Sequence, residues 1–207
     1  MTTRRGRPTQ AEAKALDLTV RNAAVATFIQ SGYDGATMEA IAKAAGITKR
    51  SLYARYADKH ALFVDVIPWA LSRFEDDRSD VFLKEQDLET ALVAVGRAAL
   101  KRAVNPENVR LKRIAMNEGG RFPEFNVTAE SMMWSGRQRV VTELLRRHEA
   151  NGEIKVDDVE LAAEHFLAMV EALPARFADF GIYRSKAQNE RHLQQAVSLF
   201  LRGVVPR

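Results

Sequence analysis

Apolar residues in this chain recur every three or four positions, which is the spacing of residues along one face of an α-helix. A first set, which ends before Gly32, is formed by Leu16, Val20, Ala24 and Phe28. Alternating runs of β-branched residues, which are typical of strands, do not occur in the 207-residue sequence. The sequence therefore predicts an all-α protein of one or two domains.

Capping residues and glycines divide the sequence into about nine predicted helices. After the first helix, Thr37, Thr48 and Asp58 are expected to cap three more, because their side chains can accept first-turn N–H groups. The fourth helix is expected to run from Lys59 to about Asp76. Five further helices are expected to begin near Leu88, at Pro106 behind Asn105, near Pro123, and behind capping boxes at DDVE (157–160, with Asp157 as the cap) and SKAQ (185–188).

Positive charge is concentrated in the N-terminal segment. Residues 1–60 contain 10 Lys and Arg against 5 Asp and Glu, a net charge of +5, whereas the remaining residues contain 21 against 22. An excess of this kind indicates a polyanionic partner for the N-terminal segment. A basic surface that is merely solvated is the alternative.

Several classes of protein are excluded by what the sequence lacks. It has no cysteine, which excludes disulfides and thiol chemistry, and no apolar run of 18 residues, so no membrane span is expected. The basic N-terminus lacks the apolar segment of a secretory signal, so a cytoplasmic location is the default. None of the four histidines follows a glutamate by three positions, and no P-loop, HExxH or G-x-S-x-G motif occurs. We therefore expect neither an enzyme nor a metal or other cofactor.

The segment TMEAIAKAAGITKRSLYARYADKH (37–60) has the form of a helix-turn-helix, in which a sharp turn joins two short helices. Gly46 allows the left-handed backbone conformation that such a turn needs. Ile41, Ile47 and Leu52 can form a small core between the two helices. In a unit of this kind the second helix enters the major groove of DNA.

The predicted third helix carries a basic face opposite its apolar one. On a helical wheel, Lys49, Arg50 and Tyr53 lie opposite Leu52. Lysine and arginine bond guanine edges or phosphates, and tyrosine can reach a phosphate or a thymine methyl group. Tyr56 lies between the two faces, which leaves packing, a phosphate contact or both open.

The stretch TMEAIAKAAGITKRSLYARYADKHALF (37–63) resembles the DNA-binding signature of TetR/AcrR-type transcriptional regulators, and the resemblance extends over about residues 15–63. It implies backbone contacts at Thr37, Tyr53, Tyr56 and Lys59, and base reading at or near Lys49, Arg50 and Ser51. Lys59 also lies at a helix N-terminus, where phosphate is favoured. Arg50 stands where many members have glycine, and His60 where glutamate is frequent. The predicted DNA-binding set is Arg4, Arg5, Arg7, Thr37, Thr48, Lys49, Arg50, Ser51, Tyr53, Tyr56 and Lys59.

The basic arm RRGRP (4–8) precedes the first helix. Arms of this kind can enter the minor groove beside the recognition helix. An unstructured solubilising tail is the alternative.

Residues 64–207 are expected to form a second domain behind the DNA-binding domain of residues 1–63. RFPEF (121–125) and NGEIKVDDVELAAEHFLAMV (151–170) resemble the AefR-like C-terminal type, which implies effector binding and dimerisation. The last two helices are apolar on more than one side, so each must bury more than one side. The resemblance implies that they do so in a homodimer, and burial within a monomer is the alternative. The dimer is favoured because two half-sites need two recognition helices. The predicted interface residues are Leu161, Leu173, Leu193, Ala196, Val197 and Phe200.

An effector pocket is expected among the large apolar residues of the second domain, which suit a hydrophobic ligand. Core packing is the alternative for each of them. Arg137 and His165 are candidate polar contacts. The apolar candidates are Trp69, Met116, Phe122, Phe125, Met133, Trp134, Phe166, Met169 and Phe177.

The resemblance as a whole implies a homodimeric repressor that a small, apolar effector releases from a palindromic operator. An activator, or a DNA-binding protein of the same fold without an effector, is the alternative. Pro68, inside the fourth helix, either kinks that helix for coupling between the domains or only fits it to the core.

Overall fold

A computed structural model describes residues 9–73 and 87–205, with the side chains of residues 123–135 excepted. Every regular element in these ranges is a helix, which confirms the predicted all-α class. The helices are α1 (Gln10–Gly35), α2 (Met38–Ala44), α3 (Lys49–Tyr53), α4 (Lys59–Ser72), α6 (Leu88–Ala103), α7 (Pro106–Gly119), α8 (Pro123–Ala150), α9 (Val159–Asp179) and α10 (Lys186–Val204).

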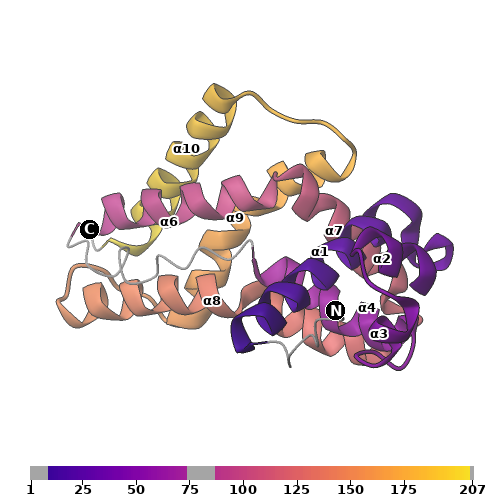
Figure 1. Cartoon of the computed structure of the whole chain (residues 1–207). Helices are drawn as coiled ribbons and strands as arrows, with labels where there is room; N and C mark the ends of the chain where they lie inside the picture. The colour runs from indigo at the N-terminus through magenta and orange to yellow at the C-terminus, as the bar shows by residue number, and fades with distance from the viewer. Residues whose placement is uncertain (1–8, 74–86, 206–207) are drawn as a thin grey trace.

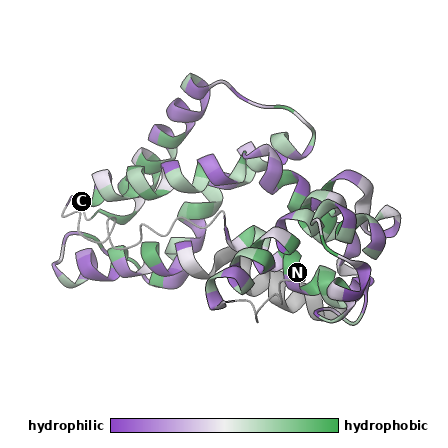
Figure 2. Cartoon of the chain, viewed as in Figure 1, coloured by the Kyte–Doolittle hydropathy of each residue, from purple (hydrophilic) through white to green (hydrophobic). Residues whose placement is uncertain are grey.

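The helices fall into two groups along the molecule. Figure 1 shows α1 to α4 at the right, α6, α9 and α10 at the left, and α7 beside α1. None of the described helices is long and apolar enough to cross a membrane. In Figure 2 individual helices carry both polar and apolar residues, as expected when each has one buried side.

Side-chain caps begin several helices where the sequence predicts them. Thr37, Thr48 and Asp58 each accept a first-turn N–H, with N···O distances of 3.1, 3.1 and 2.8 Å. Ser185 and Gln188 form the expected capping box at the start of α10. The described part of α4 ends at Ser72, so the predicted end near Asp76 lies outside the described residues.

The capping box predicted at DDVE is wrong by one residue. Asp158, not Asp157, caps α9, and it accepts the N–H of Leu161 at 2.9 Å. Glu160 is therefore one position too early to complete the box. Two adjacent aspartates can both serve as caps, and the local sequence does not distinguish between them.

Two hydrophobic cores hold the helices together. The first is built by α1 to α4 together with Leu111 and Ala115 of α7. The second is built by α6, α8, α9 and α10. Because α4 and α7 complete the first core, the helix-turn-helix depends on residues beyond position 63, and the domain boundary predicted there stays a prediction.

Gly96 lets α6 approach α9 and α10 closely. A Cβ at this position would lie 2.6 Å from Cδ1 of Leu193 and 3.4 Å from Cζ of Phe166. Both neighbours are completely buried, so they have little room to move. The absence of a side chain is thus a packing requirement of the second core.

We expect Gly96→Leu to destabilise the protein by about 1–3 kcal/mol, because it overpacks a filled core. Gly120→Leu is the control, since a Cβ there meets nothing within 4 Å, and its effect should stay within about 0.5 kcal/mol. Urea unfolding of both variants measures the difference. Equal stabilities of the two variants would show that the second core is loosely packed around Gly96.

Candidate nucleic-acid interface

The turn between α2 and α3 is built by hydrogen bonds around Gly46, whose φ is +67°. The N–H of Ile47 donates to the carbonyl of Ala42 at 3.0 Å, and the N–H of Gly46 donates to that of Lys43 at 3.1 Å. This pair of bonds, with a left-handed glycine, is the Schellman motif that ends a helix. The chain therefore leaves α2 in a defined direction and enters α3 after only a few residues.

The recognition helix α3 has five residues, too few for stability on its own. Its hold on the rest of the domain is Leu52, which is completely buried in the first core. Ile41, also completely buried, comes from α2 and belongs to the same core. Burial of these two leucine-sized side chains fixes which side of α3 faces outward.

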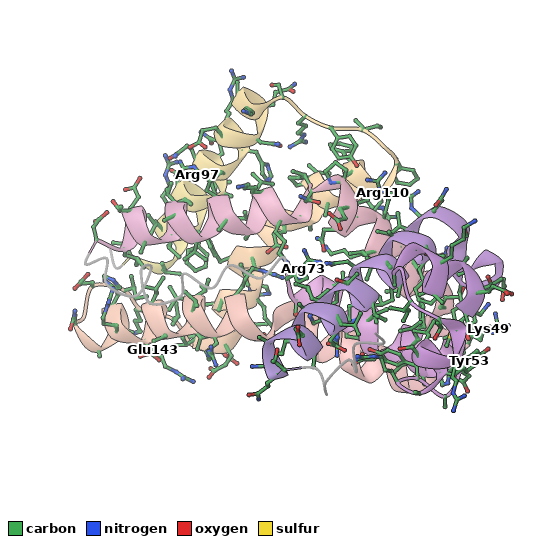
Figure 3. The ribbon with its side chains drawn as sticks, in the orientation of Figure 1. Lys49, Tyr53, Arg73, Arg97, Arg110 and Glu143 are labelled. Carbon is green, nitrogen blue, oxygen red and sulfur yellow. The ribbon has the colours of Figure 1, made fainter. Side chains whose placement is uncertain are left out.

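The outward side of α3 carries the basic face that the helical wheel predicts. Lys49, Arg50 and Tyr53 are all exposed, whereas Leu52 is not. Figure 3 places Lys49 and Tyr53 together at the outer edge of the α1–α4 group. Lys49 lies 3.6 Å from a carboxylate oxygen of Glu39, but both side chains are more than half exposed. Such a surface pair is weak, so Lys49 can exchange it for a phosphate or a base.

Three other predicted DNA-binding residues also lie near this face. The side-chain oxygens of Thr37 and Thr48 accept the capping N–H groups of α2 and α3. Their hydroxyl groups can still donate to a phosphate. Ser51, on α3, is half-buried. The predicted contacts of Arg4, Arg5 and Arg7 lie outside the described residues.

Tyr56 is half-buried and has a partner inside the protein. Its hydroxyl donates to a carboxylate oxygen of Asp65 in α4 at 2.8 Å, and its ring packs against the first core. Burial, with the bond to Asp65, raises the pKa of the Tyr56 phenol to about 12. Tyr56 therefore joins the end of the recognition segment to α4, which confirms the packing role, and the phosphate contact stays a prediction.

Lys59 has partners inside the protein, and its phosphate contact stays a prediction. Its ammonium group donates to the carbonyl oxygens of Tyr33 and Ala36 at 2.7 and 3.0 Å, and to that of Asp34 at 3.3 Å. It also lies 4.4 Å from the centre of the Tyr33 ring. These carbonyls end α1 and lack partners within that helix, so the cation caps the helix C-terminus. Its charge is engaged inside the domain.

Comparison with known families agrees with this geometry. Residues 20–66 match the family described as bacterial regulatory proteins, tetR family, and residues 90–203 match the AefR-like transcriptional repressor, C-terminal domain. The second match alone covers more than half of the 207 residues. This chain belongs to the TetR family of transcriptional regulators.

Solved structures of TetR-family proteins resemble the whole chain. One, a TetR-family regulator of Mesorhizobium loti MAFF303099, is 27% identical with a TM-score of 0.86, over 96% of this chain and 100% of that one. The flavonoid-responsive regulator FrrA is 29% identical with a TM-score of 0.73, over 94% and 99%. The regulator FadR of Bacillus subtilis, in complex with stearoyl-CoA, is 15% identical with a TM-score of 0.66, over 90% and 98%, and shows the fold alone. No curated protein matches the sequence.

A polar network that the sequence analysis missed fastens this TetR-type DNA-binding domain to α4. Arg21 of α1 donates to Asp17 at 2.9 Å and lies 3.0 Å from an oxygen of Asp65, the same carboxylate that binds Tyr56. Arg21 also lies over the ring of Trp69, 5.3 Å from its centre. Only the Asp17–Arg21 spacing of four residues signals any of this in the sequence.

The junction of α7 and α8 docks on the end of α1. Arg121 forms an ion pair with Asp34 at 2.6 Å, and the bond lowers the pKa of that carboxyl group. Phe122 packs against Tyr33 and Phe63, with ring centres 4.9 and 5.8 Å apart. Helices behind the TetR-type domain are thus in direct contact with its first helix.

The predicted effector-pocket residues do not gather in one place. Trp69 and Phe122 pack against the first core, whereas Phe166 and Met169 belong to the second. Met116 is 77% exposed. Of the others, His165 is exposed, Phe177 is half-buried, Arg137 pairs with Glu171, and the side chains of Phe125, Met133 and Trp134 lie outside the described residues.

The predicted interface residues divide in the same way. Leu161 and Leu173 of α9 are 46% and 48% exposed. The remaining four are already buried inside one chain, so their side chains fill the second core and do not form an outer face: Leu193, Ala196, Val197 and Phe200.

We expect Lys59→Met to lower the free energy of unfolding by about 1.5–3 kcal/mol, the usual cost of losing bonds from a charged donor. The salt dependence of DNA binding should stay unchanged, because the ammonium group contacts α1. Lys43→Met, at an exposed lysine of α2, is the control for stability. Denaturant unfolding and DNA binding across a salt series provide the two measurements. A salt slope lower by about one, without loss of stability, would restore the phosphate contact.

Proposed function

We propose that this TetR-family chain is a homodimeric repressor that reads a palindromic operator with α3 and is released by a small apolar molecule. The observation that carries the DNA-binding part is the exposed face of Lys49, Arg50 and Tyr53. This face stands on a helix whose orientation is set by the Gly46 turn and by buried Leu52. The roles of individual residues follow from their chemistry.

Arg50 is proposed to read a base, because it has five N–H donors and its side chain is exposed on α3. Lys49 and Tyr53 are proposed to contact phosphates or the outer edge of the groove. The hydroxyl groups of Thr37 and Thr48 lie at the starts of α2 and α3 and add phosphate donors. The arm of residues 4–8 is proposed to enter the adjacent minor groove.

A single α3 reads only one half-site, and a palindromic operator needs two such helices about 34–36 Å apart. A dimer would supply the two recognition helices, and an exposed row of residues on α9 supports such a dimer. Leu161, His165, Ala168 and Ala172 are exposed and recur at intervals of four, three and four residues, so they share one side of the helix. Small alanines in this row allow a second helix to approach closely. Leu199 of α10, 56% exposed, adds apolar surface.

Release by an effector is supported by the contacts between the two groups of helices. Helix α7 contacts both α1 and α4, and α4 also contacts α8. A ligand that favours one arrangement of the second core would therefore shift α4 and α1, and with them the spacing of the two recognition helices. FrrA, by its name, responds to flavonoids, which supports a small-molecule effector for this chain as well.

Selection of bound fragments from a random DNA pool tests the proposal and identifies the operator. We expect a palindrome for the wild type, and a relaxed base preference at one position per half-site for Arg50→Ala, which corresponds to about 1–3 kcal/mol of lost discrimination. Arg110→Ala is the matched control, because Arg110 is an exposed arginine on α7 that Figure 3 shows well away from Lys49 and Tyr53. An unchanged profile for Arg50→Ala contradicts base reading by Arg50.

We expect Ala168→Arg to convert the dimer into monomers, because it places a long charged side chain in the middle of the exposed row on α9. Ala168 is exposed in the single chain, so the fold should be retained. Met116→Arg, at an exposed position on α7, is the control. Analytical ultracentrifugation gives the mass. A dimeric Ala168→Arg variant with normal operator affinity would place the dimer interface elsewhere.

A further inference from the structure

A buried arginine in the second group of helices has two guanidinium nitrogens without a hydrogen-bond partner among the described residues. Arg102 lies in the last turn of α6 and is only 6% exposed. Its Nε and Nη1 atoms are buried and have no hydrogen-bond partner, and no carboxylate of the described residues pairs with its guanidinium group. Leu100, two positions earlier, and Ala103, the next residue, are buried and apolar, whereas Lys101 is exposed.

A buried guanidinium group without a partner lowers the stability of the folded protein. Arginine stays protonated in proteins, so burial does not remove its charge, and a buried charge without a partner is strongly unfavourable. Arg137 of α8, whose side chain is 12% exposed, shows the usual solution. Nε of Arg137 lies 3.0 Å from a carboxylate oxygen of Glu171, whose side chain is 8% exposed. Arg102 therefore needs an anion that the described part of the chain does not supply.

The position of Arg102 is the corner where α6 turns into α7. The carbonyl oxygen of Arg102 accepts a hydrogen bond from Nδ2 of Asn108 at 3.0 Å. Asn108 is completely buried, and its Oδ1 atom also has no hydrogen-bond partner. Of these two side chains, Arg102 has the donors that an anion can accept from, whereas the Asn108 oxygen is itself an acceptor. Helix α7, which begins at this corner, continues to the contacts with α1 and α4.

We propose that Arg102 binds the carboxylate group of an apolar carboxylic acid, and that this acid is the class of effector to which the protein responds. A carboxylate carries a single negative charge and balances one guanidinium group, whereas a phosphate monoester would bring about 1.5–2 charges to a site with one cation. The buried apolar residues Leu100 and Ala103 near Arg102 on α6 favour a hydrocarbon body over a polar one. The effector part of this inference rests on the function proposed above, but the anion site does not.

The first test compares ligands on the wild-type protein by isothermal titration calorimetry. We expect sodium octanoate to bind at least about tenfold more tightly than 1-octanol, because only the carboxylate forms charge-assisted hydrogen bonds with Arg102. Sodium phosphate at the same concentration should not displace octanoate. Equal affinities for octanoate and 1-octanol, or displacement by phosphate, would overturn the proposed carboxylate site.

The second test uses variants. Arg102→Met should bind octanoate and 1-octanol about equally, and without ligand it should be at least as stable as the wild type, because an unpaired buried charge has been removed. Lys101→Met removes the same charge from the neighbouring exposed position and should keep the preference for octanoate. A retained preference in Arg102→Met, or a large loss of its stability without ligand, contradicts the site. If Arg102→Met does not fold, the wild-type comparison and a second variant, Arg102→Lys, decide the question. Arg102→Lys should show a weaker preference for octanoate over 1-octanol than the wild type.

A third measurement separates the anion site from the proposed function. Octanoate is titrated into the complex of the protein with its selected operator, and DNA release is followed by fluorescence anisotropy. Release from the wild type but not from Arg102→Met supports both inferences. Carboxylate-selective binding without release keeps the anion site and overturns its role in regulation. Absence of operator binding at any salt concentration overturns the proposed function alone.

Discussion

The DNA-binding domain depends on the hydrogen bonds between the ammonium group of Lys59 and the carbonyl oxygens at the C-terminal end of α1. The ammonium group joins the first residue of α4 to three carbonyls around the end of α1 and to the ring of Tyr33. Tyr33 in turn contacts Phe63 and Phe122, so the same point is the meeting place of α1, α4 and the start of α8. The recognition helix is too short to orient itself, and it takes its direction from this surrounding framework.

Coupling between the two cores follows from this arrangement. On the DNA-binding side of α4, Asp65 binds Tyr56 and Arg21, and Pro68 is buried further along the same helix. Helix α7 begins at the buried corner of Arg102 and Asn108 and ends beside Arg121, which is paired with Asp34 of α1. Helix α7, which contacts both α1 and α4, thus connects the Arg102 corner with the DNA-binding domain.

Local signals predicted much of the fold. Caps at Thr37, Thr48, Asp58 and Ser185 and the turn at Gly46 are in the structure as expected, because each depends on residues within a few positions of one another. The outward face of α3 also follows from helical periodicity and the burial of Leu52. The sequence cannot choose between two adjacent aspartates as a cap, and here the prediction for α9 was wrong by one residue.

Residue types and spacing thus determined the helical class, the helix-turn-helix and the basic face of the recognition helix. Only the tertiary structure decided which partners the hydrogen-bond donors and charges of polar side chains have. Lys59 has the same sequence context whether its ammonium group meets a phosphate or the carbonyls of α1, and Tyr56 whether its hydroxyl meets a phosphate or Asp65. In the sequence Arg102 looks like an ordinary helical arginine, and only the folded structure shows that it is 6% exposed. Partners that lie far apart in sequence, and the loss of solvent around a charge, have no local signature.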